Sequence, residues 1–343
     1  MPASQFQYYT STDPSGPGPI TGQAGSLLSV LDACLVNGYG SKAAAGWSKP
    51  FANSGNIGCY QNGATIPHGM NPATGLSLLI NDNGPNGTST YKEAWAVGWE
   101  AIASIGSPVG TGTGQFPLPA QLLSGNVVVR KSFTADTTPR YWELFGDAYT
   151  FYFFVQSGDQ AGVYFGLFFG DIFSLKGASD AYRCFIHGSY VENSGANGSC
   201  QLDAQPPPSG NACALQFPVG GLYMPRTFGG SGTSINVTRI GDFGLVAISS
   251  TSSPVAWNGL MQTPNGPDLS LYLTPAWVCE PLLVCKRGRM RGFYQLGHPA
   301  ANFADGQTFN GANDYAGKTF QIVKGGIWGG LWCIETSATV ETN

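Results

Sequence analysis

Short apolar segments separated by turn residues recur along most of this chain, and this pattern constrains its fold most strongly. The most apolar region, residues 149–173, contains two aromatic segments on either side of Ser157-Gly158-Asp159-Gln160. Segments of this length, bounded by Gly, Asn, Asp and Ser, are typical of β-strands joined by turns. Aromatic residues occupy both alternating sets of positions in each segment, so we expect both faces of these strands to be buried.

Strand candidates occur on both sides of a polar break at residues 191–212. Before the break they cover residues 77–80, 93–102, 127–133, 140–144, 149–155, 163–169 and 182–186. After the break they cover residues 234–239, 245–249, 269–274, 282–286, 292–296, 319–323 and 331–335. Strands at this spacing predict a mainly β protein, an antiparallel β-sandwich or barrel-like fold with long Gly/Pro-rich loops.

The chain divides into four segments. Residues 1–24, rich in Ser, Thr, Gly and Pro, are expected to form an extended arm that is disordered or laid across another subunit. Residues 25–190 are expected to form a β-rich domain that begins with a helix. Residues 191–212 are expected to be a Pro/Gly/Ser loop or linker, and residues 213–343 a second β-rich domain or the completion of the same sheet system.

One amphipathic helix is predicted near the N-terminus, in the segment SLLSVLDACLVNGYGSK (residues 26–42). Apolar residues recur there at helical spacing: Leu27, Leu28, Leu31, Cys34 and Leu35. Ser26 is placed to cap the start, and Asn37-Gly38 to end the helix. Cys34 lies late on the apolar stripe with no histidine nearby in the sequence, so we interpret it as a core residue rather than a nucleophile.

Charged residues are sparse. They make up only 10% of the chain, against roughly 25% in a typical soluble domain. We infer that neighbouring subunits cover much of the surface. The net charge is −4, and the densest basic cluster is CKRGRMR, residues 285–291. We interpret this cluster as a strand end or turn with a local ion-pairing role, and we expect no specific nucleic-acid partner.

The cysteine and histidine pattern predicts neither a metal site nor any other cofactor. The eight cysteines are Cys34, Cys59, Cys184, Cys200, Cys213, Cys279, Cys285 and Cys333, and no two are spaced as CxxC. His68, His187 and His298 lie far apart. The N-terminus lacks the pattern of a signal peptide, and no run of about 18 apolar residues occurs. We therefore expect a soluble protein made in the cytoplasm, without a membrane partner, whose thiols are free and buried rather than paired in four disulfides.

Several acids near the aromatic strands are candidates for paired catalytic carboxylates: Glu143, Asp147, Asp159, Asp171 and Asp180. Asp147 and Asp171 each follow Phe-Gly, where a turn aspartate bonds its own backbone, so we interpret both as turn-forming. Ser231 lies in a glycine-rich segment without a following helix, and residues 110–114 lack the lysine of a phosphate loop. We therefore predict no catalytic, cofactor-binding or metal-binding residues, and no enzyme activity.

Three segments carry a resemblance to a known family. They are residues 28–51 (LSVLDACLVNGYGSKAAAGWSKPF), residues 142–186 and residues 287–335, which begin RGRMRGFYQLGH. These segments resemble a widespread family of uncharacterised structural proteins of tailed double-stranded DNA bacteriophages. The resemblance implies a non-enzymatic virion component that binds other virion proteins and copies of itself. It is expected at the tail or baseplate, with neck or capsid decoration as the alternative.

A second alternative is a host-recognition protein that binds or cleaves carbohydrate. Its sugar platforms would be exposed tryptophans: Trp95, Trp99, Trp257, Trp277, Trp328 and Trp332. This hypothesis requires tryptophans at the surface beside paired acids.

Overall fold

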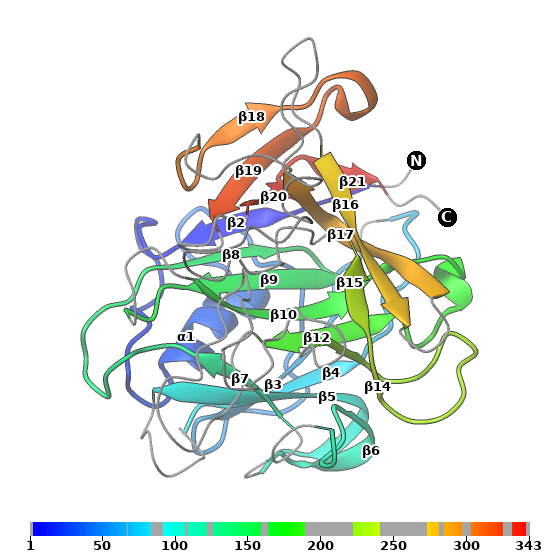
Figure 1. Cartoon of the computed structure of the whole chain (residues 1–343). Coiled ribbons are helices and arrows are strands. Elements are labelled where there is room, and N and C mark those ends of the chain that lie inside the picture. The colour runs from blue at the N-terminus through cyan, green and yellow to red at the C-terminus, as the bar shows by residue number, and fades with distance from the viewer. Residues whose placement is uncertain are drawn as a thin grey trace, which may run out of the picture.

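The computed structural model of the chain contains three main antiparallel sheets and one helical segment near the N-terminus (Figure 1). The structure describes residues 3–66, 68–83, 92–106, 109–121, 126–158, 164–188, 222–240, 273–280, 285–296, 303–324 and 331–340. The predicted mainly β, antiparallel fold is therefore confirmed. The predicted strand at residues 245–249 and the predicted loop or linker at residues 191–212 lie outside the described residues.

The central sheet contains the two aromatic strands and is buried on both faces. Its strands, in spatial order, are β14 (Ile235–Asn236), β13 (Leu222–Met224), β12 (Cys184–Gly188), β10 (Phe165–Asp171), β9 (Thr150–Val155), β8 (Trp142–Gly146) and β2 (Gln7–Thr10). Every residue of β9 and β10 is buried, as predicted. Phe151 and Phe153 point into one core, whereas Tyr152 and Phe154 point into another. Both faces are covered by the same chain, so the aromatic strands need no neighbouring subunit to bury them.

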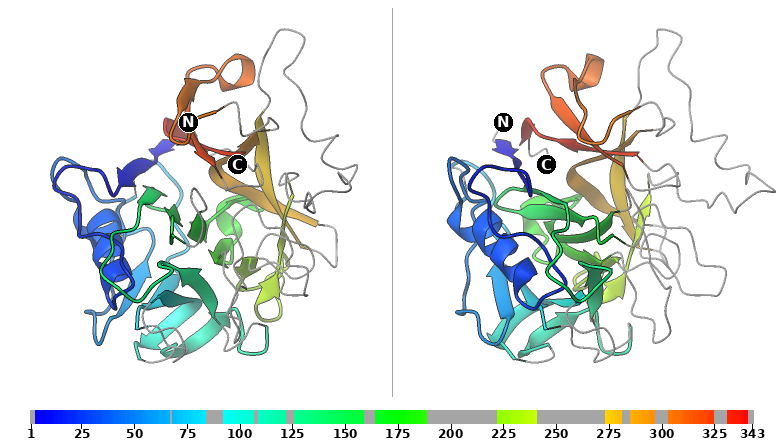
Figure 2. Two further views of the ribbon diagram at one scale, coloured as in Figure 1. Left: turned by 60° about the vertical axis from the view of Figure 1, so that its left-hand side comes forward. Right: turned by 90° about the vertical axis from the view of Figure 1, so that its left-hand side faces the viewer.

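One face of the central sheet is covered by a second sheet and the helix. The second sheet consists of β3 (Ile57–Gln61), β4 (Ser77–Asn81), β5 (Glu93–Ser104) and β6 (Thr111–Phe116), and β7 (Val127–Arg130) also pairs with β5. The helix and the inner side chains of this sheet share one core with the central strands. Figure 2 shows the helix lying beside the sheets at the edge of the molecule.

The helix lies where the sequence predicts it, although it starts differently. It begins as α1 (Ser26–Leu31) and continues in the wider π form as η1 (Asp32–Asn37). Gly38 follows with a φ of 72°, which confirms the predicted stop. Ser26 is not the cap: the N-cap is Gly25, and the Ser26 hydroxyl donates to the carbonyl oxygens of Thr21 and Gln23.

The opposite face of the central sheet is covered by the third sheet. Its strands are β15 (Thr238–Ile240), β16 (Leu273–Glu280), β17 (Cys285–Leu296), β20 (Leu331–Glu335), β19 (Thr319–Lys324) and β18 (Thr308–Asn310), and β11 (Phe173–Ser174) also pairs with β17. The predicted strand at residues 292–296 and the described end of the one predicted at residues 282–286 both fall on the single long strand β17, whereas residues 282–284 lie outside the described residues. The predicted strand at residues 234–239 is divided, since β14 pairs in the central sheet and β15 in the third.

Residues 3–24 contain two extended strands followed by turns, and the strands pair within their own chain. β2 pairs with β8, and β1 (Ala3–Gln5) pairs with β21 (Ala338–Val340), which places the two termini close together (Figure 2). Tyr9 and Ile20 are fully buried in the core beneath the central sheet. The described part of the segment is therefore an ordered and integral part of this chain's fold.

Candidate functional site

The basic cluster of residues 285–291 supplies two fully buried arginines to the interface between the central and third sheets. Arg287 Nη1 donates to Glu280 Oε1 over 2.9 Å, and Arg287 Nη2 lies 3.3 Å from Asp180 Oδ1. Arg291 Nη2 lies 3.1 Å from Asp147 Oδ2. The predicted ion-pairing role is confirmed, and of the two places expected, a strand end or a turn, the cluster occupies the first part of the strand β17.

The candidate acids differ in what they bind. Asp147 Oδ1 accepts hydrogen bonds from the backbone N–H groups of Tyr149 and Thr150, both over 2.9 Å, which confirms its turn-forming role. Asp180 Oδ1 accepts the backbone N–H of Tyr182 over 3.1 Å and so also shapes a turn. Asp159 lies outside the described residues.

The turn-forming interpretation of Asp171 is wrong. Its carboxylate accepts hydrogen bonds from the Asn62 side chain and from the backbone and hydroxyl of Thr74, and it lies 3.3 Å from Arg183 Nε. Asp171 is the last residue of β10, and its side chain reaches a loop that is distant in sequence. The aspartates of the two Phe-Gly-Asp segments, Asp147 and Asp171, therefore have different structural roles.

Glu143 is the most chemically distinctive acid of the described chain. It is 1% exposed, and its Oε1 accepts the hydroxyls of Tyr8 over 2.7 Å and Tyr141 over 2.6 Å. Its Oε2 is buried without a hydrogen-bond partner. Burial, with a smaller contribution from the nearby carboxylate of Asp305, raises the pKa of Glu143 to about 7, although the hydrogen bonds from the two phenols lower it. Glu143 therefore titrates near neutral pH.

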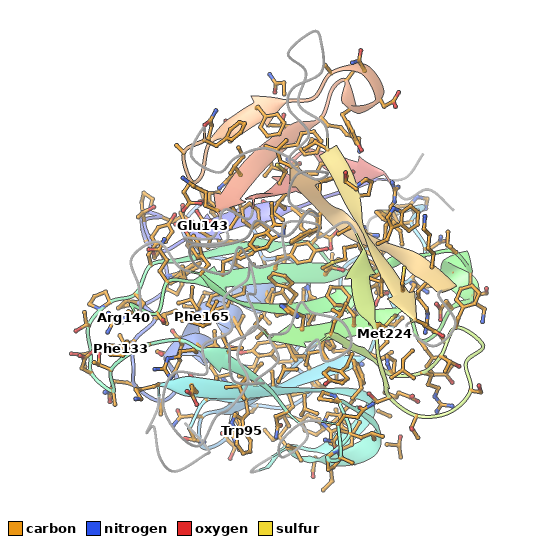
Figure 3. All side chains as sticks on the ribbon, viewed as in Figure 1. Trp95, Phe133, Arg140, Glu143, Phe165 and Met224 are labelled. Atoms are coloured by element: carbon orange, nitrogen blue, oxygen red, sulfur yellow. The ribbon has the colours of Figure 1, made fainter. Side chains whose placement is uncertain are left out.

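Glu143 lies where the central and third sheets meet. It belongs to β8 of the central sheet, and Figure 3 shows it near the third sheet. Tyr164, just before β10, donates its hydroxyl to Asp305 Oδ2 over 2.6 Å, and its ring lies edge-on to that of Tyr141. We define the tyrosine–carboxylate cluster as Tyr8, Tyr141, Glu143, Tyr164 and Asp305. This cluster can hold a proton near neutral pH, but its central carboxyl group is enclosed by protein.

An open recess of about 440 Å³ lies beside α1. It is lined by Gly25, Leu28, Ser29, Asp32, Asn53, Gly55 and Asn56. Asp32 is already bound on both oxygens, by the Tyr60 hydroxyl over 2.7 Å and by Lys49 Nζ over 2.9 Å. The acid in this recess is therefore held in place by structural hydrogen bonds.

Cys34 is a core residue, as predicted. It is fully buried with the leucines of the helix, and burial raises the pKa of its thiol well above the ordinary value. Cys34, Cys59, Cys184 and Cys333 are free and buried, and Cys279 is buried as well. No group of three or more His, Cys, Asp or Glu side chains that could hold a metal ion occurs among the described residues. His298 lies outside them.

Most of the described tryptophans cannot act as sugar platforms. Trp95, Trp99 and Trp332 are buried, and Figure 3 shows Trp95 on the second sheet. Trp277 is half-buried, and Lys286 Nζ lies 4.7 Å from the centre of its ring. Trp257 and Trp328 lie outside the described residues. Three of the six tryptophans that the carbohydrate-binding hypothesis requires at the surface are therefore buried.

Sequence reasoning missed two groups of residues. It treated Glu143 as one of several candidate acids and did not connect it with Tyr141, two residues away, or with Tyr8 and Tyr164, which come from distant segments. It also missed the buried pair of Lys131 and Asp82, which lies beneath the start of α1. No local pattern marks either group, since each forms only when strands pair.

Among the described residues, none of the helices has the length and apolar character needed to cross a membrane.

Comparisons with known proteins identify no family for this chain. No protein-family model and no curated protein matches the chain.

Proposed function

We propose that the protein is a non-enzymatic structural component of a tailed-bacteriophage virion, located at the tail or baseplate. It assembles with copies of itself and with other virion proteins through β-rich interfaces. The proposal of a non-enzymatic role is supported by the buried ion pairs of the candidate acids. Asp147, Asp171 and Asp180 each face a buried arginine, so these three acids serve to hold segments of the fold together.

The charge pattern supports assembly as well. A chain with only 10% charged residues, several of them buried in ion pairs, leaves few charges to keep its surface solvated. Contacts with neighbouring subunits would cover such a surface. The resemblance of residues 28–51, 142–186 and 287–335 to phage structural proteins points to the same class of function.

The second sheet offers an edge suited to such contacts. Among the described strands, β6 pairs only with β5, and its residues Thr111–Gly114 are exposed. An exposed strand edge presents backbone N–H and C=O groups that a neighbouring strand can pair with. We expect subunit contacts at this edge, because its Gly/Thr sequence carries no charge that would repel a partner strand.

Quantitative mass spectrometry of purified particles tests this function. If the protein is a virion component, it co-purifies with intact particles at a fixed copy number through a density gradient. Separating heads from tails then distinguishes the tail or baseplate from the neck or capsid surface. Recovery of the protein only from the particle-free lysate would overturn the proposal.

A further inference from the structure

Lys131 and Asp82 form a fully buried pair in the second sheet. Both side chains are 0% exposed, and Lys131 Nζ is in direct contact with Asp82 Oδ1. Asp82 directly follows β4, and Lys131 directly follows β7. Both strands pair with β5 on its opposite edges, so the two side chains meet across the first residues of β5. Strand pairing therefore fixes both backbones on either side of the contact.

The surrounding groups hold each reacting atom in place. Asp82 Oδ2 accepts the backbone N–H of Leu27 over 2.8 Å, in the first turn of α1. Lys131 Nζ donates to the Gln23 carbonyl oxygen over 2.5 Å and to Ser26 Oγ over 3.1 Å. Asp82 Oδ1 contacts Nζ but accepts no aligned hydrogen bond. The amine is thus oriented by two acceptors while it lies against the carboxyl group.

Burial also favours the neutral form of both partners. It lowers the pKa of Lys131 and raises the pKa of Asp82, in each case against the attraction between the two charges. Proton transfer from the ammonium to the carboxylate gives a neutral amine beside a carboxylic acid. A neutral amine is a nucleophile, and a protonated carboxyl group has a better leaving group than a carboxylate.

We propose that Lys131 and Asp82 join in an intramolecular isopeptide bond. The lone pair of Nζ attacks Asp82 Cγ, and the Cγ–Nζ bond forms. The N–H of Leu27 stabilises the negative charge that develops on Oδ2. One Nζ proton passes to Oδ1, which also takes the carboxyl proton and leaves as water when the Cγ–Oδ1 bond breaks. No oxidant, reductant or further reactant is required.

The product suits the site. Oδ2 becomes the amide oxygen and keeps the hydrogen bond from Leu27, while the remaining Nζ–H keeps an acceptor in Gln23 or Ser26. Two buried charges disappear, which removes the cost of keeping ions away from water. The bond also ties β4 to β7 across β5, so it restricts the unfolded chain as other cross-links do.

The chemistry is specific to this pair among the buried ion pairs. In the part of the chain that the structure describes, the other buried ion pairs have Arg183, Arg287 and Arg291 as their cations, and a guanidinium remains protonated and does not act as a nucleophile. Other described lysines that form ion pairs are partly exposed, such as Lys49 with Asp32. Burial, contact and a lysine coincide only at Lys131 within the described chain.

Intact-mass spectrometry of the folded, full-length protein tests the proposal. The protein is incubated at neutral pH, unfolded and weighed, and it is then digested with trypsin. The expected mass is lower than the sequence mass by one water. The digest should contain one branched peptide that includes Asp82 and Lys131, without cleavage after Lys131. The full sequence mass, with two separate peptides, would overturn the proposal, and this readout needs no variant to fold.

Variants identify the bonded atoms. Lys131→Arg should restore the mass expected for its sequence, whereas Lys49→Arg, the control at a partly exposed ion pair, should still lose one water. Asp82→Asn should form the same bond with loss of ammonia, and so reach the same final mass as the bonded wild-type protein. Loss of water that persists in Lys131→Arg would contradict the assignment.

Discussion

Arg291 on β17 and Asp147 before β9 join the third sheet to the central sheet. Arg291 Nη2 lies 3.1 Å from Asp147 Oδ2, and each side chain is 1% exposed. The other carboxylate oxygen of Asp147 accepts the backbone N–H groups of Tyr149 and Thr150. One aspartate therefore shapes the turn into β9 and also binds the neighbouring layer. This contact links the central and third sheets, in addition to the hydrophobic core that they share.

Arg291→Ala should destabilise the fold strongly, because it leaves the carboxylate of Asp147 buried without its cation. We expect a loss of about 3–5 kcal/mol in the free energy of unfolding, measured by urea denaturation. Lys49→Ala is the control, since Lys49 pairs with Asp32 at a partly exposed site and should cost about 1 kcal/mol or less. Equal losses in the two variants would contradict the structural role of the buried pair.

Glu143→Gln should change how stability depends on pH. The pKa of Glu143 is raised from 4.5 to about 7 in the folded protein, so between these values the folded state binds more protons than the unfolded state. The contribution of this group to stability is therefore complete below about pH 4.5 and is lost as the pH rises to about 7. Glu143→Gln removes that loss and should be more stable than the wild type at pH 8.

Urea denaturation at pH 5 and pH 8 measures this effect. The difference in unfolding free energy between the two pH values should be smaller in Glu143→Gln than in the wild type. Glu100→Gln is the control, because Glu100 pairs with Arg226 near the surface. An unchanged pH dependence in Glu143→Gln would show that Glu143 is already ionised at pH 5.

Ile20→Ala should destabilise the protein although it lies in the predicted arm. Ile20 is fully buried in the core beneath the central sheet, and removing its side chain should cost about 2–5 kcal/mol by urea denaturation. Leu175→Ala is the control, since Leu175 is 60% exposed and should change stability by about 0.5 kcal/mol or less.

Because Tyr9 and Ile20 are buried in the core, deleting residues 1–24 should impair folding as well as any role in assembly. A stable truncated chain would contradict this placement.

Cys34 should resist alkylation in the folded protein. Its thiol is buried, and its raised pKa leaves almost no reactive thiolate at neutral pH. Peptide mass spectrometry after treatment with iodoacetamide should find Cys34 unmodified under native conditions and modified in urea. Cys59 and Cys333 are buried in the same way and should behave alike. Rapid native labelling of Cys34 would contradict its core position.

The sequence predicts elements whose own residues determine their burial. The apolar pattern of residues 331–335 predicts a strand, and β20 has the same bounds. The aromatic pattern of β9 and β10 predicts burial on both faces because alternating side chains must point in opposite directions. Leucine spacing predicts the helix in the same local way.

Other elements depend on partners that local sequence does not reveal. β6 consists of Gly, Thr, Gln and Phe and is extended because it pairs with β5. β2 lies in a Ser/Thr-rich segment, but its pairing with β8 buries Tyr9. The tyrosine–carboxylate cluster and the pair of Lys131 and Asp82 likewise combine residues from separate strands. Only the folded chain shows these contacts.

Cryo-electron microscopy of intact phage particles tests the proposed function most directly. We expect density for the stacked sheets at a fixed position on the tail or baseplate, with subunit contacts at the β6 edge. Particles that are complete and infectious but contain no density for this chain at any position would contradict the proposal.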